Sequence, residues 1–149
     1  NNVFGPYQYP EKIIPRFITR LLENKKVPLH GSGSNIRTYM FVNDFANALD
    51  LVFNRGKIGE IYNLGTSDEI SNLELTKLML KKLGKDDSYI DFVEDRPFND
   101  KRYSIDVSKI KALGWRQKYS FEEGLNETIE WYKYNKGWWR NKANKRLNG

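Results

Sequence analysis

The chain has 149 residues, of which 39% are hydrophobic and 14% aromatic, a composition typical of a folded unit rather than a disordered segment. It contains no cysteine and one histidine, which excludes a disulfide framework, a thiolate metal site, a cysteine nucleophile and a multi-histidine metal site. The formal net charge is +6 at pH 7. We find neither a signal peptide nor an apolar run of the roughly 18 residues that cross a bilayer, so we expect no membrane contact and a cytoplasmic protein.

The N-terminal segment, NNVFGPYQYP, has no initiator Met and already carries glycine and proline residues that are typical of turns. We therefore interpret the chain as part of a longer protein. Pro6 and Pro10 keep this segment extended. Over residues 12–23, apolar positions three and four apart predict an amphipathic helix, with Pro15 in its first turn, where a missing N–H costs little.

The segment that follows predicts two strands and a helix. Residues 27–35, VPLHGSGSN, predict a short strand that enters a glycine-rich turn. The turn lacks the G-x-G-x-x-G and Walker A patterns, so we do not expect it to bind a dinucleotide or nucleotide phosphate. Residues 38–42 predict a second strand, and we expect Asn43 or Asp44 to cap a helix that ends near Gly56.

Residues 60–66, EIYNLGT, predict a further strand. Ser71 and Glu74 form a capping box, which predicts a helix that begins there and ends at Gly84. Residues 89–95 predict another strand.

The C-terminal part predicts a short helix over residues 108–114 and a longer one that starts at a second capping box, Ser120 with Glu123, and continues through Tyr132. Strands thus alternate with helices, which favours an α/β or α+β arrangement. No linker or internal repeat divides residues 1–149, so we expect one unit.

Residues 136–149 form a basic tail without acidic residues. Its positive charges are Lys136, Arg140, Lys142, Lys145 and Arg146. Two interpretations are open: a solvated, fraying terminus, or a segment that contacts an anion or a nucleic acid.

Candidate catalytic residues are few. Tyr132 and Lys136 have the spacing of a tyrosine–lysine pair that performs acid–base chemistry, but they fall at the end of an amphipathic helix, so we expect no such role. Glu11 or Asp44 could act as a general base in principle, although no neighbouring residue forms a catalytic motif with either of them.

Anion-binding signals are stronger, because they recur at the ends of predicted elements. Arg37 follows the flexible turn and precedes a strand, and Arg96 follows a strand and is stiffened by the next residue, a proline; guanidinium groups can bind phosphate through two hydrogen bonds. Lys12 and Asn72 lie at helix starts, where N–H groups favour anions. His30 is either a packed strand residue or a ligand contact.

Five segments, in this order, resemble one enzyme family: NNVFGPYQYPEKIIPRFI, VPLHGSGSNIRTYMFVNDFANAL, GEIYNLGT, EDRPFNDKRYSID and KIKALGW. They resemble the C-terminal part of nucleoside-diphosphate-glucose 4,6-dehydratases, which are extended short-chain dehydrogenase/reductases. The resemblance implies an α/β fold in which residues 1–149 form mainly the smaller α+β substrate-binding domain beside an NAD-binding Rossmann domain. It also implies NAD as cofactor, a nucleotide-sugar substrate and a homodimer of the full-length enzyme.

The resemblance assigns site residues by position. Asn2 would contact the sugar or diphosphate, and Val3 would line the nicotinamide side of NAD. The implied substrate-binding residues are Asn2, Glu11, Lys12, Pro28, Leu29, His30, Arg37, Asn72, Arg96 and Asn99. Of these, Lys12 with Glu11 would reach the substrate, Pro28, Leu29 and His30 would border the nucleoside base, and Arg37 and Arg96 would clamp the diphosphate with help from Asn72.

The chain departs from the bacterial dTDP-glucose pattern at Asn99, where those members often carry a histidine after a glycine that is Phe98 here. RPFND is more similar to the UDP-rhamnose-forming enzymes, so the base, thymine or uracil, stays open.

The reaction implied is an internal hydride transfer that yields a 4-keto-6-deoxy sugar, as in rhamnose-type biosynthesis. The family's Tyr-x-x-x-Lys pair, acid–base carboxylates and glycine-rich NAD loop have no counterpart in these 149 residues, so we expect substrate binding but no catalytic residue in this chain. The alternatives are a related nucleotide-sugar epimerase or decarboxylase and, more remotely, a basic nucleic-acid-binding module.

Overall fold

The computed structural model describes residues 2–95, 97, 100–102 and 105–145, with side chains up to residue 141. Its elements in chain order are β1 (Asn2–Phe4), α1 (Ile13–Leu22), β2 (Val27–His30), β3 (Ile36–Phe41), α2 (Val42–Arg55), β4 (Glu69–Ser71), α3 (Asn72–Lys82), the 3-10 turn η1 (Asp87–Tyr89), β5 (Ile90–Val93), α4 (Ser108–Ala112), α5 (Phe121–Tyr134) and α6 (Lys136–Lys145). None of the helices in these ranges is long and apolar enough to cross a membrane.

The strands form two small sheets. β3 lies between β1, which is parallel to it, and β4, which is antiparallel, while β2 pairs with β5 in a separate parallel pair. The α/β class and the strands predicted near β2, β3 and β5 are confirmed. The glycine-rich turn after β2 is also confirmed, since Gly33 N–H bonds back to the His30 carbonyl at 3.1 Å.

The strand predicted for residues 60–66 is wrong. This segment has no regular structure and pairs with no strand in the described part of the chain. Its polar side chains bond to isolated carbonyls instead: the Thr66 hydroxyl donates to Tyr39 and the Asn63 amide to Asp106, at 3.0 and 3.2 Å. β4 pairs only with Ile36–Thr38 of β3, and the contact of Thr66 with the next residue, Tyr39, is made by a side chain and not by a backbone ladder.

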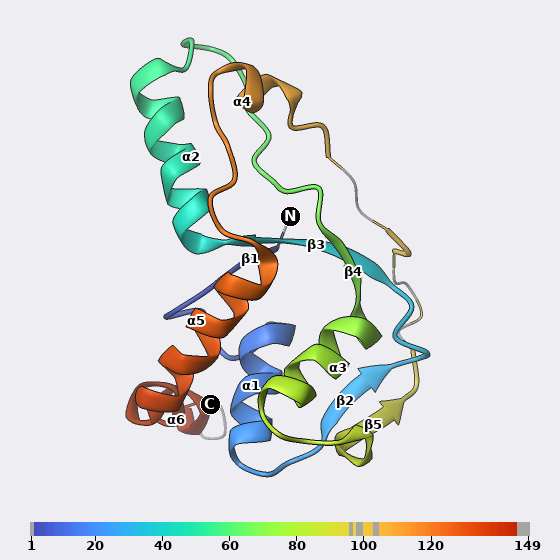
Figure 1. Cartoon of the computed structure of the whole chain (residues 1–149). Coiled ribbons are helices and arrows are strands. Elements are labelled where there is room, and N and C mark those ends of the chain that lie inside the picture. The colour runs from blue at the N-terminus through green and yellow to red at the C-terminus, as the bar shows by residue number, and fades with distance from the viewer. Residues whose placement is uncertain (1, 96, 98–99, 103–104, 146–149) are drawn as a thin grey trace.

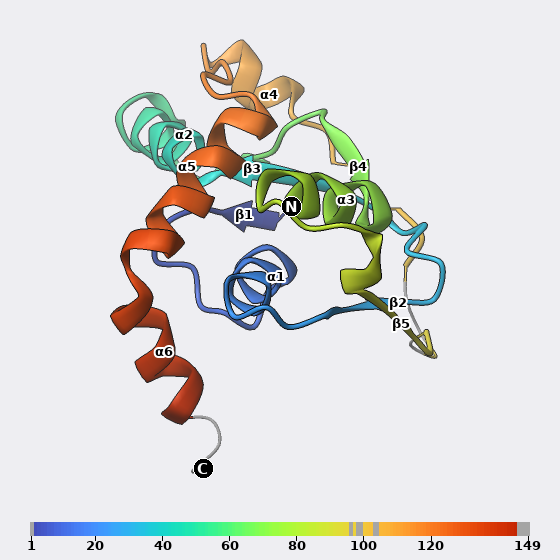
Figure 2. The same ribbon diagram turned by 60° about the horizontal axis from the view of Figure 1, so that its bottom comes forward.

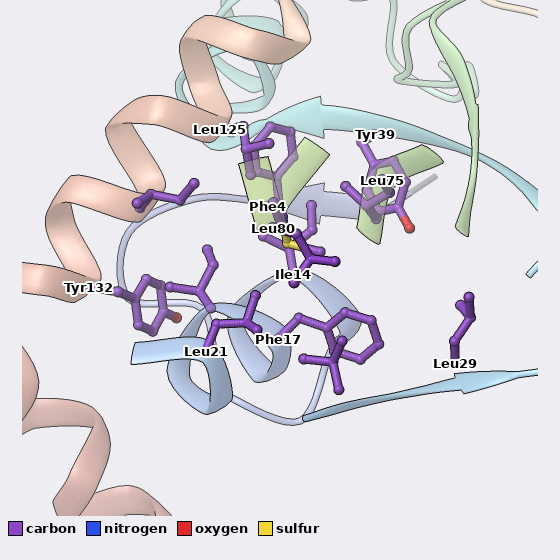
Figure 3. Close-up of a cluster of buried hydrophobic side chains, with 14 of the residues drawn as sticks. Phe4, Ile14, Phe17, Leu21, Leu29, Tyr39, Leu75, Leu80, Leu125 and Tyr132 are labelled. Carbon is purple, nitrogen blue, oxygen red and sulfur yellow. The ribbon is translucent and has the colours of Figure 1, made fainter. Parts of the chain in front are cut away.

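β3 separates two hydrophobic cores because its side chains alternate between faces. Tyr39 and Phe41 point into the larger core, and Met40 points into the smaller. Figure 3 shows the larger core, where side chains of α1, α3 and α5 meet those of β1 and β3. The smaller core holds Ala48, Ile110 and Trp115. Each large side chain buried in these cores stabilises the fold by about 1.5–3 kcal/mol relative to leaving it exposed.

The helices divide in the same way. α1, α3 and α5 gather against β1 and β3, whereas α2 and α4 lie together at the far end of β3 (Figure 1). The view in Figure 2 places the β2–β5 pair on one side of α1 and α6 on the other. The segment between α1 and β3 therefore forms one edge of the molecule.

Both predicted capping boxes are confirmed. The Ser71 and Ser120 hydroxyls accept from the N–H groups of Glu74 and Glu123, whose carboxylates bond back to the serine N–H groups. The predicted cap of α2 is wrong. Phe41 is the N-cap residue and no side chain caps it. Asp44 lies in the first turn of α2, and its carboxylate accepts from the N–H groups of Lys118 and Tyr119 instead.

The basic tail begins as helix α6, so its first part is not a fraying terminus. Trp139 is only 1% exposed, and its indole N–H donates to the Tyr132 carbonyl at 2.9 Å. The predicted helix from Ser120 ends at Tyr134, and a break at Asn135 lets α6 turn so that Trp139 reaches the core.

Candidate functional site

A cavity of about 280 Å³ lies among the N-terminal half of α1, the strands β1, β2 and β3, and the start of α3. The predicted site residues that line it are Asn2, Glu11, Lys12, Pro28, Leu29, His30, Arg37 and Asn72. The structure thus brings together residues that are up to 70 positions apart in the sequence. Arg96 and Asn99 lie outside the described residues.

Neighbouring strands hold two of these side chains. Asn2 lies on β1 opposite Tyr39 of β3, and its amide donates to the Thr38 carbonyl at 3.4 Å. Arg37 lies near the start of β3 and donates from Nη1 to the Ile36 carbonyl at 2.7 Å. The sheet therefore brings a side-chain amide and a guanidinium to the same cavity.

The start of α1 supplies the second wall. Lys12 is the N-cap residue, no side chain caps the helix, and the first turn contains no acidic residue. A cation at this end opposes the helix dipole, which favours negative charge there. Glu11 lies 3.6 Å from the Lys12 ammonium, which offsets part of this cost. A lysine beside uncapped N–H groups makes a favourable place for a bound anion.

The β2 strand brings His30 to the cavity in a fixed orientation. Nδ1 lies 3.0 Å from the Glu94 carbonyl, and since a carbonyl only accepts, this nitrogen carries the proton. Gly31 follows with a φ of +55°, and a Cβ there would lie 2.9 Å from the Asp95 carboxylate. Only glycine therefore suits this close approach of the β5 end to the turn.

The chain beyond the β5 loop returns to the same wall. Ile36 donates its N–H to the Lys101 carbonyl at 2.8 Å, and the Asn35 amide donates to the Asp100 carbonyl at 3.3 Å. Arg102 pairs with Glu69 at 2.8 Å. The described residues on both sides of position 96 are thus anchored beside His30 and the start of β3.

A second cavity of about 240 Å³ adjoins the first, because both are lined by Asn2, Lys12, Ile13 and Tyr39. Val3, expected to lie near NAD, lines this smaller cavity together with Gln8. Burial raises the pKa of the Tyr39 hydroxyl far above its usual value, despite a smaller opposing effect of Arg37. Tyr39 therefore stays protonated and can both donate and accept a hydrogen bond.

Arg16 is a charged residue of the larger cavity that the sequence did not predict as a site residue. It lies one turn after Lys12 on α1 and lines the larger cavity. Its guanidinium makes no hydrogen bond or ion pair with a described residue, whereas that of Arg20, one turn further, donates to the Lys26 carbonyl at 2.6 Å. The signal in the sequence was the spacing of four from Lys12, which places both cations on one helix face.

The weak catalytic candidates have other roles. The Tyr132 hydroxyl donates to the Gln8 carbonyl, and burial raises its pKa far above the usual value. Lys136 belongs to a different helix, so the two do not form an acid–base pair. The Asp44 carboxylate accepts the N–H groups of Lys118 and Tyr119, each at 3.0 Å. It joins α2 to the segment before α5 and lies away from the cavity.

No group of three or more His, Asp or Glu side chains in the described ranges is arranged to hold a metal ion. Cations, amides and one imidazole line the larger cavity together with apolar side chains. Such a site suits a molecule that carries both phosphates and hydroxyls.

Comparison with known proteins identifies relatives of this chain. The family model described as GDP-mannose 4,6 dehydratase matches residues 1–128. A trifunctional UDP-glucose 4,6-dehydratase/UDP-4-keto-6-deoxy-D-glucose 3,5-epimerase/UDP-4-keto-L-rhamnose-reductase of Arabidopsis thaliana is 46% identical over 140 residues, which are 93% of this chain and 21% of that protein.

Solved structures share the fold. A dTDP-glucose 4,6-dehydratase from Streptomyces venezuelae, with NAD bound, is 44% identical with a TM-score of 0.91, over 95% of this chain and 44% of that one. A UDP-glucose 4-epimerase from Thermotoga maritima is 31% identical with a TM-score of 0.84, over 89% and 44%. The chain thus spans less than half the length of these relatives. It belongs to the GDP-mannose 4,6 dehydratase family of extended short-chain dehydrogenase/reductases.

Proposed function

We propose that this chain supplies the substrate-binding part of a nucleoside-diphosphate-glucose 4,6-dehydratase, which converts dTDP- or UDP-glucose to the 4-keto-6-deoxy sugar. One observation carries the proposal: Asn2, Lys12, Arg37 and Asn72, which come from four separate elements, line one cavity. Relatives whose names include UDP-glucose and dTDP-glucose 4,6-dehydratase support the choice of substrate.

In this proposal different residues bind different parts of the ligand. Arg37 and Lys12 bind the diphosphate, and Asn72 assists from the start of α3. Pro28, Leu29 and His30 border the pyrimidine. Both flanks of position 96 are anchored at this wall, which supports Arg96 as a second diphosphate contact and Asn99 as its neighbour. Fixing these groups before binding lowers the entropy cost of capture.

NAD is the cofactor that this proposal requires, and when bound it supplies the hydride acceptor and donor for the sugar. The chain offers Val3, beside the smaller cavity, as a contact on the nicotinamide side. That fit is limited to one wall, because the 149 residues contain no G-x-x-G-x-x-G loop. The role of this chain is to hold and orient the sugar nucleotide, not to move its protons.

The test is calorimetry of UDP-glucose and dTDP-glucose binding to the full-length protein and to its Arg37→Met variant. Loss of a charge-assisted contact should weaken binding by about 1.5–3 kcal/mol, which is about 10- to 150-fold in Kd. Arg96→Met should show a loss of the same order.

Arg55→Met is the matched control, because Arg55 is an exposed arginine at the end of α2 that does not line the cavity. Equal affinity of the Arg37 variant and the parent would show that the diphosphate does not bind at this wall. Absence of binding to the parent would end the proposal as a whole.

A related nucleotide-sugar epimerase is the second candidate, favoured by the shared fold of the Thermotoga maritima UDP-glucose 4-epimerase. Product analysis separates the two, since only the dehydratase yields a 4-keto-6-deoxy sugar. The higher identity to a dehydratase, 44% against 31%, favours the first.

The remaining parts of the proposal are a homodimer of the full-length protein, a cytoplasmic location and no binding of nucleic acid or membranes. Nucleic-acid binding by the basic tail is the less favoured interpretation, because the buried Trp139 packs α6 against the core. Light scattering of the full-length protein tests the dimer.

A further inference from the structure

The imidazole of His30 is held at one of its two ring nitrogens. Nδ1 lies 3.0 Å from the Glu94 carbonyl and donates to it. In the neutral ring the other nitrogen, Nε2, is therefore an acceptor. The side chain makes no further hydrogen bond or ion pair in the described part of the chain. The chain that follows β5 thus fixes the tautomer of the ring and leaves its acceptor unused.

This acceptor is open to a ligand. In the described part of the chain, Gln8 Oε1 is the buried side-chain nitrogen or oxygen that has no hydrogen-bond partner. Nε2 of His30 also has no partner but is not such a buried atom, so part of its surface is accessible. His30 is half-buried and lines the larger cavity. Nε2 is therefore available to a donor on a molecule bound there.

The wall that β2 contributes to the larger cavity is neutral and largely apolar. Pro28, Leu29 and His30 line the cavity from this strand, and Phe17 lines it from α1. Pro28 and His30 share one face of β2, because side chains of alternate strand residues point to the same side, and both are half-buried. A flat, uncharged ring suits such a wall.

Charge distinguishes this wall from the rest of the cavity. Lys12 and Arg37 bring positive charge to the cavity from the start of α1 and from β3. Just beyond β2, a Cβ on Gly31 would lie 2.9 Å from the Asp95 carboxylate, so a negative group adjoins the end of this strand. A phosphate is therefore more stable beside the cations, and the neutral end of a nucleotide is more stable beside His30.

The neutral end of a pyrimidine nucleotide is its base. Uracil and thymine carry an N3–H donor between two carbonyls, whereas N3 of cytosine has no hydrogen and is an acceptor. Proteins read a base through hydrogen bonds of this kind at its Watson–Crick edge. An imidazole acceptor opposite N3 gains a hydrogen bond from uracil or thymine, but in cytosine it meets a second acceptor.

We propose that Nε2 of His30 accepts a hydrogen bond from the N3–H of the pyrimidine and so selects uracil and thymine nucleotides over cytosine nucleotides. The inference rests on the proposed function, since it takes a nucleoside diphosphate sugar as the ligand. His30 is a specificity-determining binding residue in this proposal, and it takes no part in the reaction.

The first test compares the binding of UDP and CDP to the full-length protein by calorimetry at pH 8, where imidazoles are ordinarily neutral. The parent should bind UDP about tenfold more tightly than CDP. It should prefer dTDP over dCDP in the same way, because thymine has the same N3–H. A contact of Nε2 with the substituent at C4 would give the opposite preference, since that group is an amino donor in cytosine and a carbonyl in uracil.

The second test uses two variants that separate base recognition from the contact with Glu94. His30→Asn has an amide N–H near the position of Nδ1, so it can keep the bond to Glu94, but it has no group at the position of Nε2. His30→Gln places an acceptor near the position of Nε2 and gives up the bond to Glu94. The preference for UDP should disappear in His30→Asn and persist in His30→Gln, and thermal melts check that both variants fold.

The outcomes separate this inference from the proposed function. If the parent binds neither UDP nor dTDP, the proposed function fails. If the parent binds UDP and CDP equally, or prefers CDP, the function stands and the base contact is wrong. If His30→Asn keeps the preference, another group reads the base, and the inference is wrong. If both variants lose UDP and CDP by the same factor, His30 is structural, and the inference is again wrong.

Discussion

Two buried acceptors have opposite surroundings. The Asp44 carboxylate is fully buried on α2, and two backbone N–H groups donate to it at 3.0 Å. Gln8 Oε1 is also buried, but no described group donates to it. The protein satisfies the first acceptor and leaves the second without a described partner.

The contrast separates a polar group with a structural role from one whose hydrogen-bond partner the described residues do not supply. Burying an unpaired acceptor opposes folding, so such groups are rare in folded proteins. Asp44 looked like a possible base in the sequence, yet its hydrogen bonds make it a joint between α2 and the segment before α5. Gln8 belongs to no recognisable sequence motif, and it lines the smaller cavity together with Lys12 and Asn2.

The largest effect is expected when the hydrogen bonds of the Asp44 carboxylate are removed. Asp44→Ala leaves the N–H groups of Lys118 and Tyr119 without their partner and removes two charge-assisted bonds, so the free energy of unfolding should fall by about 3 kcal/mol. Urea denaturation followed by circular dichroism measures it. Asp50→Ala, an exposed change on the same helix, should cost under about 0.5 kcal/mol. Similar stability of the two variants would contradict this structural role of Asp44.

The next effect concerns the cavity and leaves the fold intact. Arg16→Met removes a guanidinium that has no described partner, so stability should hardly change. UDP-glucose binding should weaken about tenfold, which is about 1.4 kcal/mol. Arg20→Met should show the reverse, because its hydrogen bond to Lys26 serves the end of α1. Calorimetry and thermal melts of both variants sharpen the difference between a ligand-facing and a structural arginine.

Helix caps should give smaller losses, away from both regions. Ser71→Ala and Ser120→Ala each remove an N-cap acceptor and should cost about 1 kcal/mol of unfolding free energy. The two sites share no partner, so the losses should add in the double variant. Ser120→Asp retains an acceptor and should keep most of the stability in the same urea titration. No loss in Ser120→Ala would contradict the capping role.

The smallest effect depends on pH. Hydrogen bonds from the hydroxyl and backbone N–H of Ser71 and Ser120 hold the pKa of the Glu74 and Glu123 carboxyls below its usual value. Because the folded pKa is the lower one, this stabilisation is present above the unfolded pKa of about 4.3 and is lost as the pH falls through the folded value.

Thermal melts between pH 7 and pH 3 test this sign. Glu74→Gln with Glu123→Gln should melt below the parent at neutral pH, and the difference should shrink toward pH 3. Glu127→Gln, exposed on α5, should melt like the parent throughout. A difference that grows on acidification would contradict the assignment.

The sequence predicted the elements whose signals are local. The helix at residues 12–23 followed from apolar spacing, both capping boxes from their residue types, and the β2 turn from its glycines, because each signal acts within a few residues. The resemblance also named most of the residues that line the larger cavity. That Lys12, His30, Arg37 and Asn72 line one cavity is a fact of the tertiary structure.

The errors came from partners that lie far away in the chain. Residues 60–66 have strand-forming side chains, but side-chain bonds to the distant carbonyls of Tyr39 and Asp106 hold this segment instead of a backbone ladder. Asp44 has a capping side chain, but N–H groups more than 70 residues away bind it. Helix periodicity and turn chemistry are short-range and were readable from the residues alone. Which edge is free, which acceptor is satisfied and where the cavity opens depend on contacts that only the folded chain makes.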